Sequence, residues 1–240
     1  MTRIDIPHVS RIEGHASITI DLDESGRVSD TRFHVTQVRG FEKFVEGRPY
    51  YEMPAITARI CGICPVSHLL ASSKACDEIM AVRVPPTAAK LRELLHMAQI
   101  VQSHALSFFH LSAPDLLLGM DYDPALRNVA GLLAEHPAVV TDGVKLRKFG
   151  QQVIERLGRE RIHPSWTVPG GVNSQLDPAA REKTLEEWPA ALAILQRTLE
   201  LWKGTIDSFP DEVATFSNFP TMYCGTVAPD GALELYDGAL

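Results

Sequence analysis

Apolar and polar residues alternate along two segments near the start of the chain, on either side of a short polar turn. Both segments lie in 16-ASITIDLDESGRVSDTRFHVTQV-38, with Glu24-Ser25-Gly26 between them. A period of two residues is typical of a strand with one buried face, so the pattern predicts a β-hairpin. A short apolar-rich stretch, 41-FEKFVEG-47, follows it.

The pattern then changes to helical spacing. Pro65 suits the first position of a helix, where its missing N–H costs nothing, and residues 66–81 continue that helix until Pro85-Pro86 bounds its exit. From Thr87 to about Pro114, apolar residues recur every three or four positions, which predicts a long core helix. The residues of this stripe are Leu91, Leu94, Leu95, Ala98, Val101, Ala105 and Phe109.

Further helices are predicted over residues 124–135 and about 138–157, and tight-turn residues in 163–174 predict a loop. Asp177-Pro178 combines a helix N-cap with a first-position proline. It opens a helical region that reaches about Ser208 and that we expect to be kinked or divided at Pro189.

The last residues predict a strand, 232-ALELY-236, followed by the turn dipeptide Asp237-Gly238. Only Ala239 and Leu240 remain for a return strand, which would leave backbone groups of the first strand unpaired. A frayed surface tail is one explanation. We favour the other, that the chain stops in the middle of a domain.

These elements together predict an α+β fold that is mainly α, a long-helix bundle with a small N-terminal antiparallel sheet. We expect one domain, with a small β region at about 1–40, a helical core at about 41–210 and β elements at about 220–240. A chain of 240 residues with 45% hydrophobic content is long enough for a sizeable core.

Composition excludes several classes of function. A net charge of −7 and the absence of any Lys/Arg run give no footprint for nucleic acid. The first residues, MTRIDIPHVSRIEGH, have no apolar core typical of a secretory signal. The longest apolar stretch, 105–120, is interrupted by His110, Pro114 and Asp115 and is not expected to span a membrane. We therefore expect a cytoplasmic protein with reduced thiols.

The candidate chemistry lies in 59-RICGICPVSH-68, where Cys61 and Cys64 are separated by two residues. Thiolates at this spacing can bind one soft or borderline metal ion from a tight turn. Half of a zinc site, a redox pair and two core cysteines are the alternatives, and spacing alone does not decide among them. His68 and Cys76 lie eight residues apart on the same predicted helix, roughly 12 Å, so both cannot join one ion with Cys61 and Cys64 without bending that helix.

Four segments in order resemble the large subunit of [NiFe]-hydrogenases. The thiol segment resembles that family's R-x-C-G-x-C-x-x-x-H motif, and 10-SRIEGH-15, 39-RGFE-42 and 163-HPSWTVPGGV-172 resemble its R-I-E-G-H, R-G-x-E and P-G-G segments. The amino-acid sequence of 111-LSAPDLLLG-119 is most similar to the soluble, NAD-linked bidirectional group.

The resemblance implies a role for each matching residue. Cys61 would be a terminal nickel ligand, Cys64 would bridge nickel and iron, and His68 would be a donor near the bridging sulfur or the iron ligands. Glu13 would be the first proton relay, and Glu42 a ligand of a buried magnesium ion. The iron would carry carbon monoxide and cyanide.

The resemblance also implies partners, because this chain has four cysteines, too few to hold iron–sulfur clusters as well. A hydrogenase small subunit would carry the clusters, and diaphorase subunits would carry flavin and pass electrons to NAD. This implies H₂ oxidation and proton reduction.

The chain departs from the family in its second cysteine pair. The family's D-P-C-x-x-C motif and a C-terminal magnesium-binding histidine are missing, and Cys224 stands alone. We therefore expect the N-terminal part of a large subunit, inactive until the C-terminal part is supplied. Cys76 and Cys224 are predicted to be small core residues. The alternatives are a non-catalytic scaffold of the complex I type and a structural zinc-binding interaction module.

Overall fold

The computed structural model describes residues 2–239, which fall into two compact units, Met1–Gly47 and Arg48–Leu240. We call them the N-terminal unit and the helical unit and describe each by itself. The expected class is confirmed: the protein is mainly α, with long packed helices and a small antiparallel sheet near its N-terminus.

The N-terminal unit contains a three-stranded antiparallel sheet in the order β1-β2-β3, followed by the short helix α1 (Phe41–Phe44). The predicted hairpin is confirmed as β2 (Ala16–Leu22) and β3 (Val28–Val35), and β1 (Thr2–Ile6) is a further strand. Its turn is fixed by Asp23, whose Oδ1 accepts hydrogen bonds from Ser25 and Arg27.

The alternation of the sequence sorts side chains onto the two faces of this sheet. Ile18 lies opposite Ile6 on one side and Phe33 on the other, and Ile4 lies opposite Ile20. Because side chains alternate between faces along a strand, these apolar residues share one face. Arg3 and Asp21 form an ion pair on the opposite face.

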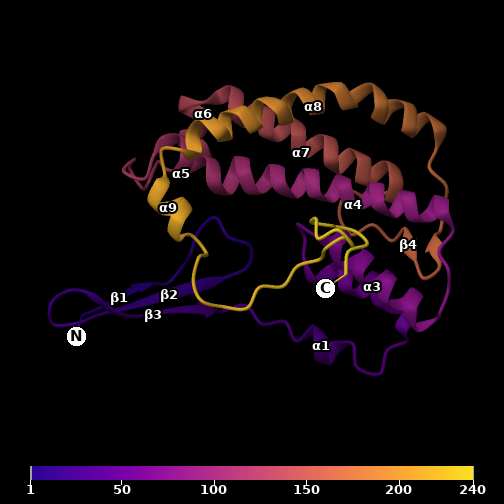
Figure 1. Ribbon diagram of the computed structural model, residues 1–240, viewed down its shortest axis with the longest axis horizontal. Helices are drawn as coiled ribbons and strands as arrows, with labels where there is room; N and C mark the ends of the chain where they lie inside the picture. Colours follow the sequence, from indigo (N-terminus) through magenta and orange to yellow (C-terminus); the bar gives the residue numbers. More distant parts are fainter. Residues whose placement is uncertain (1, 240) are drawn as a thin grey trace. The chain divides into compact units, whose positions relative to one another are not determined.

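The helical unit is built mainly from four longer helices. Figure 1 shows α4, α7 and α8 lying along one another, with the shorter α3 beside α4. The elements of this unit are η1 (Tyr50–Glu52), α2 (Met53–Thr57), η2 (Ala58–Ile60), α3 (Pro65–Ile79), α4 (Pro86–Leu106), the π-helical segment η3 (Ser107–Ser112), α5 (Ala113–Leu118), α6 (Val129–Glu135), α7 (Pro137–Gly158), β4 (Thr167–Val168), β5 (Gly171–Val172), α8 (Pro178–Ile206) and α9 (Pro210–Thr215).

The core of this unit lies between α3, α4 and α7. Leu95 of α4 is fully buried with Leu69 of α3, Ile154 of α7 and Trp166. A second cluster joins Phe109 to the neighbouring helices. The apolar stripe predicted from Leu91 to Phe109 is therefore the core face, although Leu94 at its edge is exposed.

Helix α4 and its continuation differ from the single predicted helix. Helix α4 ends at Leu106, the chain continues through η3, and α5 carries it past Pro114. Proline has no N–H, and its ring collides with the carbonyl four residues earlier, so a wider π turn before Pro114 accommodates it. The helix predicted from residue 124 begins only at Val129, where Asn128 caps it by accepting N–H groups of the first turn.

Of the two outcomes expected at Pro189, division is wrong, because α8 is one helix from Pro178 to Ile206, and a kink stays a prediction. It starts as predicted, with Asp177 as its N-cap. Tertiary contacts hold α8 to α7 on both sides of Pro189. Arg156 binds Glu187 before it, at 2.7 Å, and Arg197 binds Asp142 after it, at 2.8 Å.

The strand predicted at 232–236 does not form. Isolated bridges join Val227 to Leu233 and to Ala239 instead. This segment is held by side chains of the helical unit: Lys74 Nζ lies 2.7 Å from Asp237 Oδ1 and 4.5 Å from the ring centre of Tyr236. The ring of Tyr236 also lies beside that of His96 on α4, so contacts with α3 and α4 replace the pairing of a regular strand.

Within residues 2–239, no helix combines the length and the apolar character needed to cross a membrane.

Candidate metal centre

The two cysteines of the thiol segment lie on the turn that joins η2 to α3. Cys61 follows η2 in an extended conformation, and Cys64 is the N-cap of α3, with Pro65 at the first helical position as predicted. Cys61 is only 7% exposed and Cys64 is half-buried. The turn therefore brings both sulfur-bearing residues to the positive end of a 15-residue helix.

The sulfur of Cys61 accepts two backbone hydrogen bonds from within this turn. The N–H groups of Ile63 and Cys64 both donate to Cys61 Sγ, at 3.3 Å each. Donors directed at sulfur offset the negative charge of a thiolate, which is the form that binds a metal. The backbone of the CxxC turn is thus already folded around Cys61 Sγ, the atom that would bind a metal.

Helix α4 binds a backbone carbonyl of the same turn. The carbonyl oxygen of Ile63 accepts Gln99 Nε2 at 2.9 Å and Gln102 Nε2 at 2.6 Å. Both glutamines are buried, at 2% and 4% exposure. A turn between two elements is therefore anchored by side chains of a third.

His68 lies one helical turn after Cys64 on α3 and is half-buried. Its backbone carbonyl accepts the hydroxyl of Thr57 at 3.2 Å, which joins α3 to α2. The structure thus places His68 on the same helix as Cys76, as the sequence predicts, and its role beside a metal stays a prediction.

The other two cysteines differ in environment. Cys76 is buried on α3 and donates to the carbonyl of Tyr50 at 3.3 Å, which confirms it as a core residue. Burial, followed by the charge of neighbouring Asp77, raises the pKa of its thiol. Cys224 was predicted to lie in the core and is exposed instead. It lies in the irregular segment after α9, which lacks the helical periodicity that buries Cys76.

The segment before Cys61 is held by the loop that resembles the P-G-G motif. His163 Nδ1 lies 2.8 Å from the carbonyl oxygen of Ala58, in η2. The loop then forms the small hairpin β4–β5, and Trp166 beside it is buried and donates to Ser174. Residues more than a hundred positions apart thereby support the thiol turn.

A buried ion pair fixes the other end of this hairpin. Arg92 of α4 and Asp77 of α3 approach to 2.5 Å. Arg92 also donates to the carbonyls of Val168 and Gly171, and Asp77 accepts the N–H of Gly170 at 2.6 Å. Gly170 and Gly171 have φ values of +87° and +156°, which favour glycine, so the P-G-G sequence fits this clamp.

The predicted acidic residues belong to the N-terminal unit. Glu13 is exposed in the bend between β1 and β2, and Glu42 is exposed in the first turn of α1. The roles predicted for Glu13 and Glu42 are unchanged by this placement and remain predictions.

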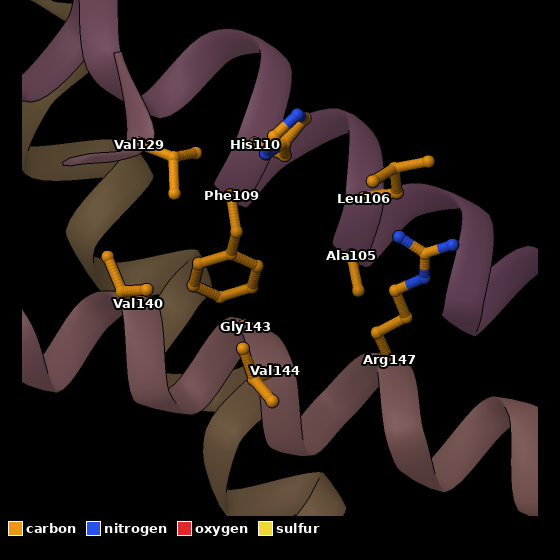
Figure 2. Close-up of a pocket in the computed structure, with 9 residues that line it drawn as sticks. All are labelled: Ala105, Leu106, Phe109, His110, Val129, Val140, Gly143, Val144 and Arg147. Atoms are coloured by element: carbon orange, nitrogen blue, oxygen red, sulfur yellow. The ribbon is translucent and has the colours of Figure 1, made fainter. Parts of the chain in front are cut away.

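An apolar cavity of about 120 Å³ in the helical unit does not include the thiols. Figure 2 shows Phe109 of η3 and Val140 of α7 among the side chains that line it, with Arg147 and His110 on its border. Its largely apolar wall offers no thiolate or carboxylate, so the candidate chemistry stays at the turn.

The donor set of that turn fits one half of a metal site. Two sulfur atoms on a backbone folded for thiolates suit nickel, iron or zinc. Across residues 2–239, no group of three or more His, Cys, Asp or Glu side chains is arranged to hold a metal ion. Cys61 and Cys64 would therefore hold such an ion together with donors from elsewhere.

Sequence reasoning missed the residues that support the turn, namely Asp77, Arg92, Gln99, Gln102 and His163. A signal for three of them exists: Arg92, Gln99 and Gln102 follow the spacing of the apolar stripe that contains Leu95 and Ala98. A polar residue on a core face needs a buried partner. The sequence does not name that partner.

Comparisons with known proteins agree with this geometry. A family described as nickel-dependent hydrogenase matches residues 39–129, and one described as HoxL-like matches residues 3–38. The chain is 42% identical over its whole length to a subunit of the F420-non-reducing hydrogenase vhu of Methanocaldococcus jannaschii, of which it covers 57%. It is 39% identical over 99% of its length to the beta subunit of the NAD-reducing hydrogenase HoxS of Cupriavidus necator, covering 51%.

Solved structures give the same result. An NAD⁺-reducing [NiFe]-hydrogenase in the H₂-reduced state superposes with a TM-score of 0.90 at 43% identity, over 99% of this chain and 53% of that one. The Ni-Fe-Se hydrogenase from D. vulgaris Hildenborough gives 0.74 at 27% identity, over 88% of this chain and 45% of that one. The chain spans about half the length of the curated relatives it matches. With its CxxC turn and the fold around it, the chain belongs to the nickel-dependent hydrogenase large-subunit family and resembles its NAD-reducing members.

Proposed function

We propose that this chain supplies two thiolate ligands, Cys61 and Cys64, to the Ni–Fe centre of a hydrogenase that oxidises H₂ and reduces protons. The observation that carries the proposal is the CxxC turn, in which two backbone N–H groups already donate to Cys61 Sγ. Relatives with hydrogenase names and similar folds support it.

The residues divide the work as follows. Cys61 would hold the nickel as a terminal ligand, Cys64 would be a ligand of both nickel and iron, and His68 would donate near the Cys64 sulfur or the iron ligands. When bound, the metals supply the Lewis acid and the redox capacity for splitting H₂, and the iron carries carbon monoxide and cyanide. A thiolate of the turn accepts the proton, and Glu13 carries it away as the first relay.

Glu42 has a separate role in this proposal. Its carboxylate binds magnesium, a hard cation that prefers oxygen ligands. Magnesium there would organise the large subunit rather than take part in the reaction.

Electrons leave through partner subunits. A small subunit would supply the iron–sulfur clusters that accept them, and diaphorase subunits would supply the flavin that passes them to NAD, so that H₂ + NAD⁺ would give NADH + H⁺. Similarity to an NAD-reducing hydrogenase at 39% identity supports this path, and we expect the complex to be cytoplasmic. A different electron acceptor is the second candidate, because a relative named F420-non-reducing hydrogenase is similar at 42% identity.

Elemental analysis of the purified native complex tests the proposal. We expect about one nickel per chain, with iron beyond that of the clusters. Cys61→Ser and Cys64→Ser should each remove most of the nickel, because a hydroxyl is a poor substitute for thiolate sulfur on a soft metal. Cys224→Ser is the matched control, since Cys224 is exposed, and it should leave the nickel content unchanged.

Other metal contents would overturn the proposal. Zinc without nickel would favour a structural zinc-binding interaction module. A native complex without any transition metal at the turn would favour a non-catalytic scaffold. H₂-dependent reduction of NAD, compared with reduction of an artificial dye, then distinguishes the two electron acceptors.

A further inference from the structure

The peptide group between Ile63 and Cys64 is bound from both sides. Its carbonyl oxygen, on Ile63, accepts the side-chain amides of Gln99 and Gln102 at 2.9 and 2.6 Å. Its N–H, on Cys64, donates to Cys61 Sγ at 3.3 Å. One peptide group therefore connects helix α4 to the sulfur of the candidate nickel ligand.

Because the peptide group is rigid, fixing its C=O also fixes its N–H. The six atoms of a trans peptide lie close to one plane, with the C=O and the N–H pointing in opposite directions. Two donors fix the direction of the Ile63 carbonyl. They consequently fix the direction in which the Cys64 N–H points, which is toward Cys61 Sγ.

The two glutamines are suited to this task by their place on α4. They are three residues apart, so they lie on one face of the helix, one turn from each other. A carbonyl oxygen has two lone pairs, and the two amides can use both. Both side chains are buried, so water cannot substitute for either donor without entering the core.

Of the two polar atoms in the Gln99 side-chain amide, only the donor Nε2 has a hydrogen-bond partner among the described residues. Its Oε1 is buried and has no hydrogen-bond partner among the described residues. Burying an unpaired amide oxygen is unfavourable, and an apolar side chain would avoid that cost. Gln99 thus buries an unpaired Oε1, which is destabilising, while its Nε2 donates to the Ile63 carbonyl.

We propose that Gln99 and Gln102 are positioning residues for the metal centre, orienting the Ile63–Cys64 peptide so that its N–H supports the Cys61 thiolate. The proposal rests on the function proposed above for the two cysteines. Neither glutamine is required to touch the metal, substrate or reacting atoms.

The test uses the full native complex with Gln99→Met, Gln102→Met and the double variant. Methionine keeps an unbranched chain of similar length and removes the donor. Gln196→Met, on the exposed side of α8, is the matched control for the same chemical change. Two quantities are measured: hydrogen–deuterium exchange of a peptide covering residues 59–68, and nickel per chain.

In the double variant we expect exchange at residues 61–64 to be at least about tenfold faster, with the rest of α3 and α4 unchanged. Nickel per chain should fall as well, because losing a partner behind a metal ligand usually weakens metal affinity about tenfold or more. Single variants keep one amide on the carbonyl and should show smaller changes in the same direction. If the double variant does not fold, the single variants still test the proposal by the same two measurements.

Unchanged exchange at residues 61–64 in all three variants would overturn the proposal. Faster exchange along the whole of α4 would overturn it too, because it would mean that the glutamines only support helix packing. Local exchange that increases without any loss of nickel would contradict the positioning role. A wild-type complex without nickel would instead overturn the proposed function, and the exchange data would still decide whether the glutamines orient this peptide.

Discussion

Arg92 Nη1 lies 2.5 Å from Asp77 Oδ2 in the interior of the helical unit, with Arg92 only 1% exposed. The pair joins α4 to α3, the helix whose N-cap is Cys64. Its remaining polar atoms bind the backbone of the β4–β5 hairpin. The helix that carries the candidate ligand is therefore fixed to two other elements through one ion pair.

Replacing Asp77 tests how strongly this clamp supports the fold. Asp77→Asn removes the negative charge and leaves the Arg92 guanidinium buried without its counter-ion. We expect a loss of about 3–5 kcal/mol in the free energy of unfolding, measured with urea on the purified protein. Asp142→Asn is the control, because Asp142 pairs with Arg197 at the surface and should cost less than about 1 kcal/mol. Equal losses in the two variants would contradict the clamp.

Gly150 of α7 allows the close approach of α4. A Cβ added at Gly150 would lie 2.8 Å from the carbonyl oxygen of Ala98 and 2.9 Å from the backbone nitrogen of Gln102. Gly150→Ala should therefore destabilise the protein by about 1–3 kcal/mol, in spite of the better helix propensity of alanine. The thermal midpoint of unfolding measures this effect.

Gly204→Ala is the matched helical control for that substitution. Nothing lies within 4 Å of a Cβ added at Gly204 in α8, so we expect a gain of up to about 1 kcal/mol. A Gly150→Ala protein as stable as the Gly204→Ala protein would show that α4 and α7 are not tightly packed at Gly150.

The proton relay proposed for Glu13 predicts a loss of turnover without a loss of metal. Glu13→Gln keeps the size of the side chain and removes its ability to exchange a proton. H₂ oxidation by the native complex should fall about 10²-fold or more, while nickel per chain stays unchanged. Glu24→Gln, at the exposed turn between β2 and β3, should retain the wild-type rate. Wild-type turnover by Glu13→Gln would assign the relay to another residue.

His96 predicts how stability changes with pH. Burial is the main reason that the pKa of His96 lies below its ordinary value of 6.5; the charge of Lys74 lowers it further and the Leu235 carbonyl opposes the shift. The unfolded chain therefore binds a proton at a pH where folded His96 is neutral. Stability is fully present above about pH 6.5 and falls as the pH decreases toward the folded pKa.

Thermal unfolding between about pH 8 and pH 5 measures this contribution. His96→Phe should reduce the decrease in the thermal midpoint over this range, because the replacement cannot be protonated. His104→Phe, on the exposed side of α4, is the control and should keep the wild-type slope. Equal slopes for wild type and His96→Phe would show that His96 does not titrate in this way.

Local sequence signals determined where several elements begin and which way they face. The β2–β3 hairpin follows from alternation and from the side chain of Asp23, which closes its own turn. Helix α3 begins at Pro65, and α8 begins after Asp177, since a first-position proline and an N-cap act within a few residues. The CxxC spacing likewise predicted the turn that carries Cys61 and Cys64.

Tertiary structure decided whatever depends on residues far away in the chain. Pro189 remains inside α8 because α7 holds the helix on both sides. Residues 232–236 form no regular strand, and Tyr236 lies against Lys74 of α3 and His96 of α4 instead. The sequence placed Gln99 and Gln102 on a core face, but only the fold shows that they bind Ile63, 36 and 39 residues earlier. Periodicity and capping act over a few residues, whereas the partner of a buried polar group is selected by how the helices pack.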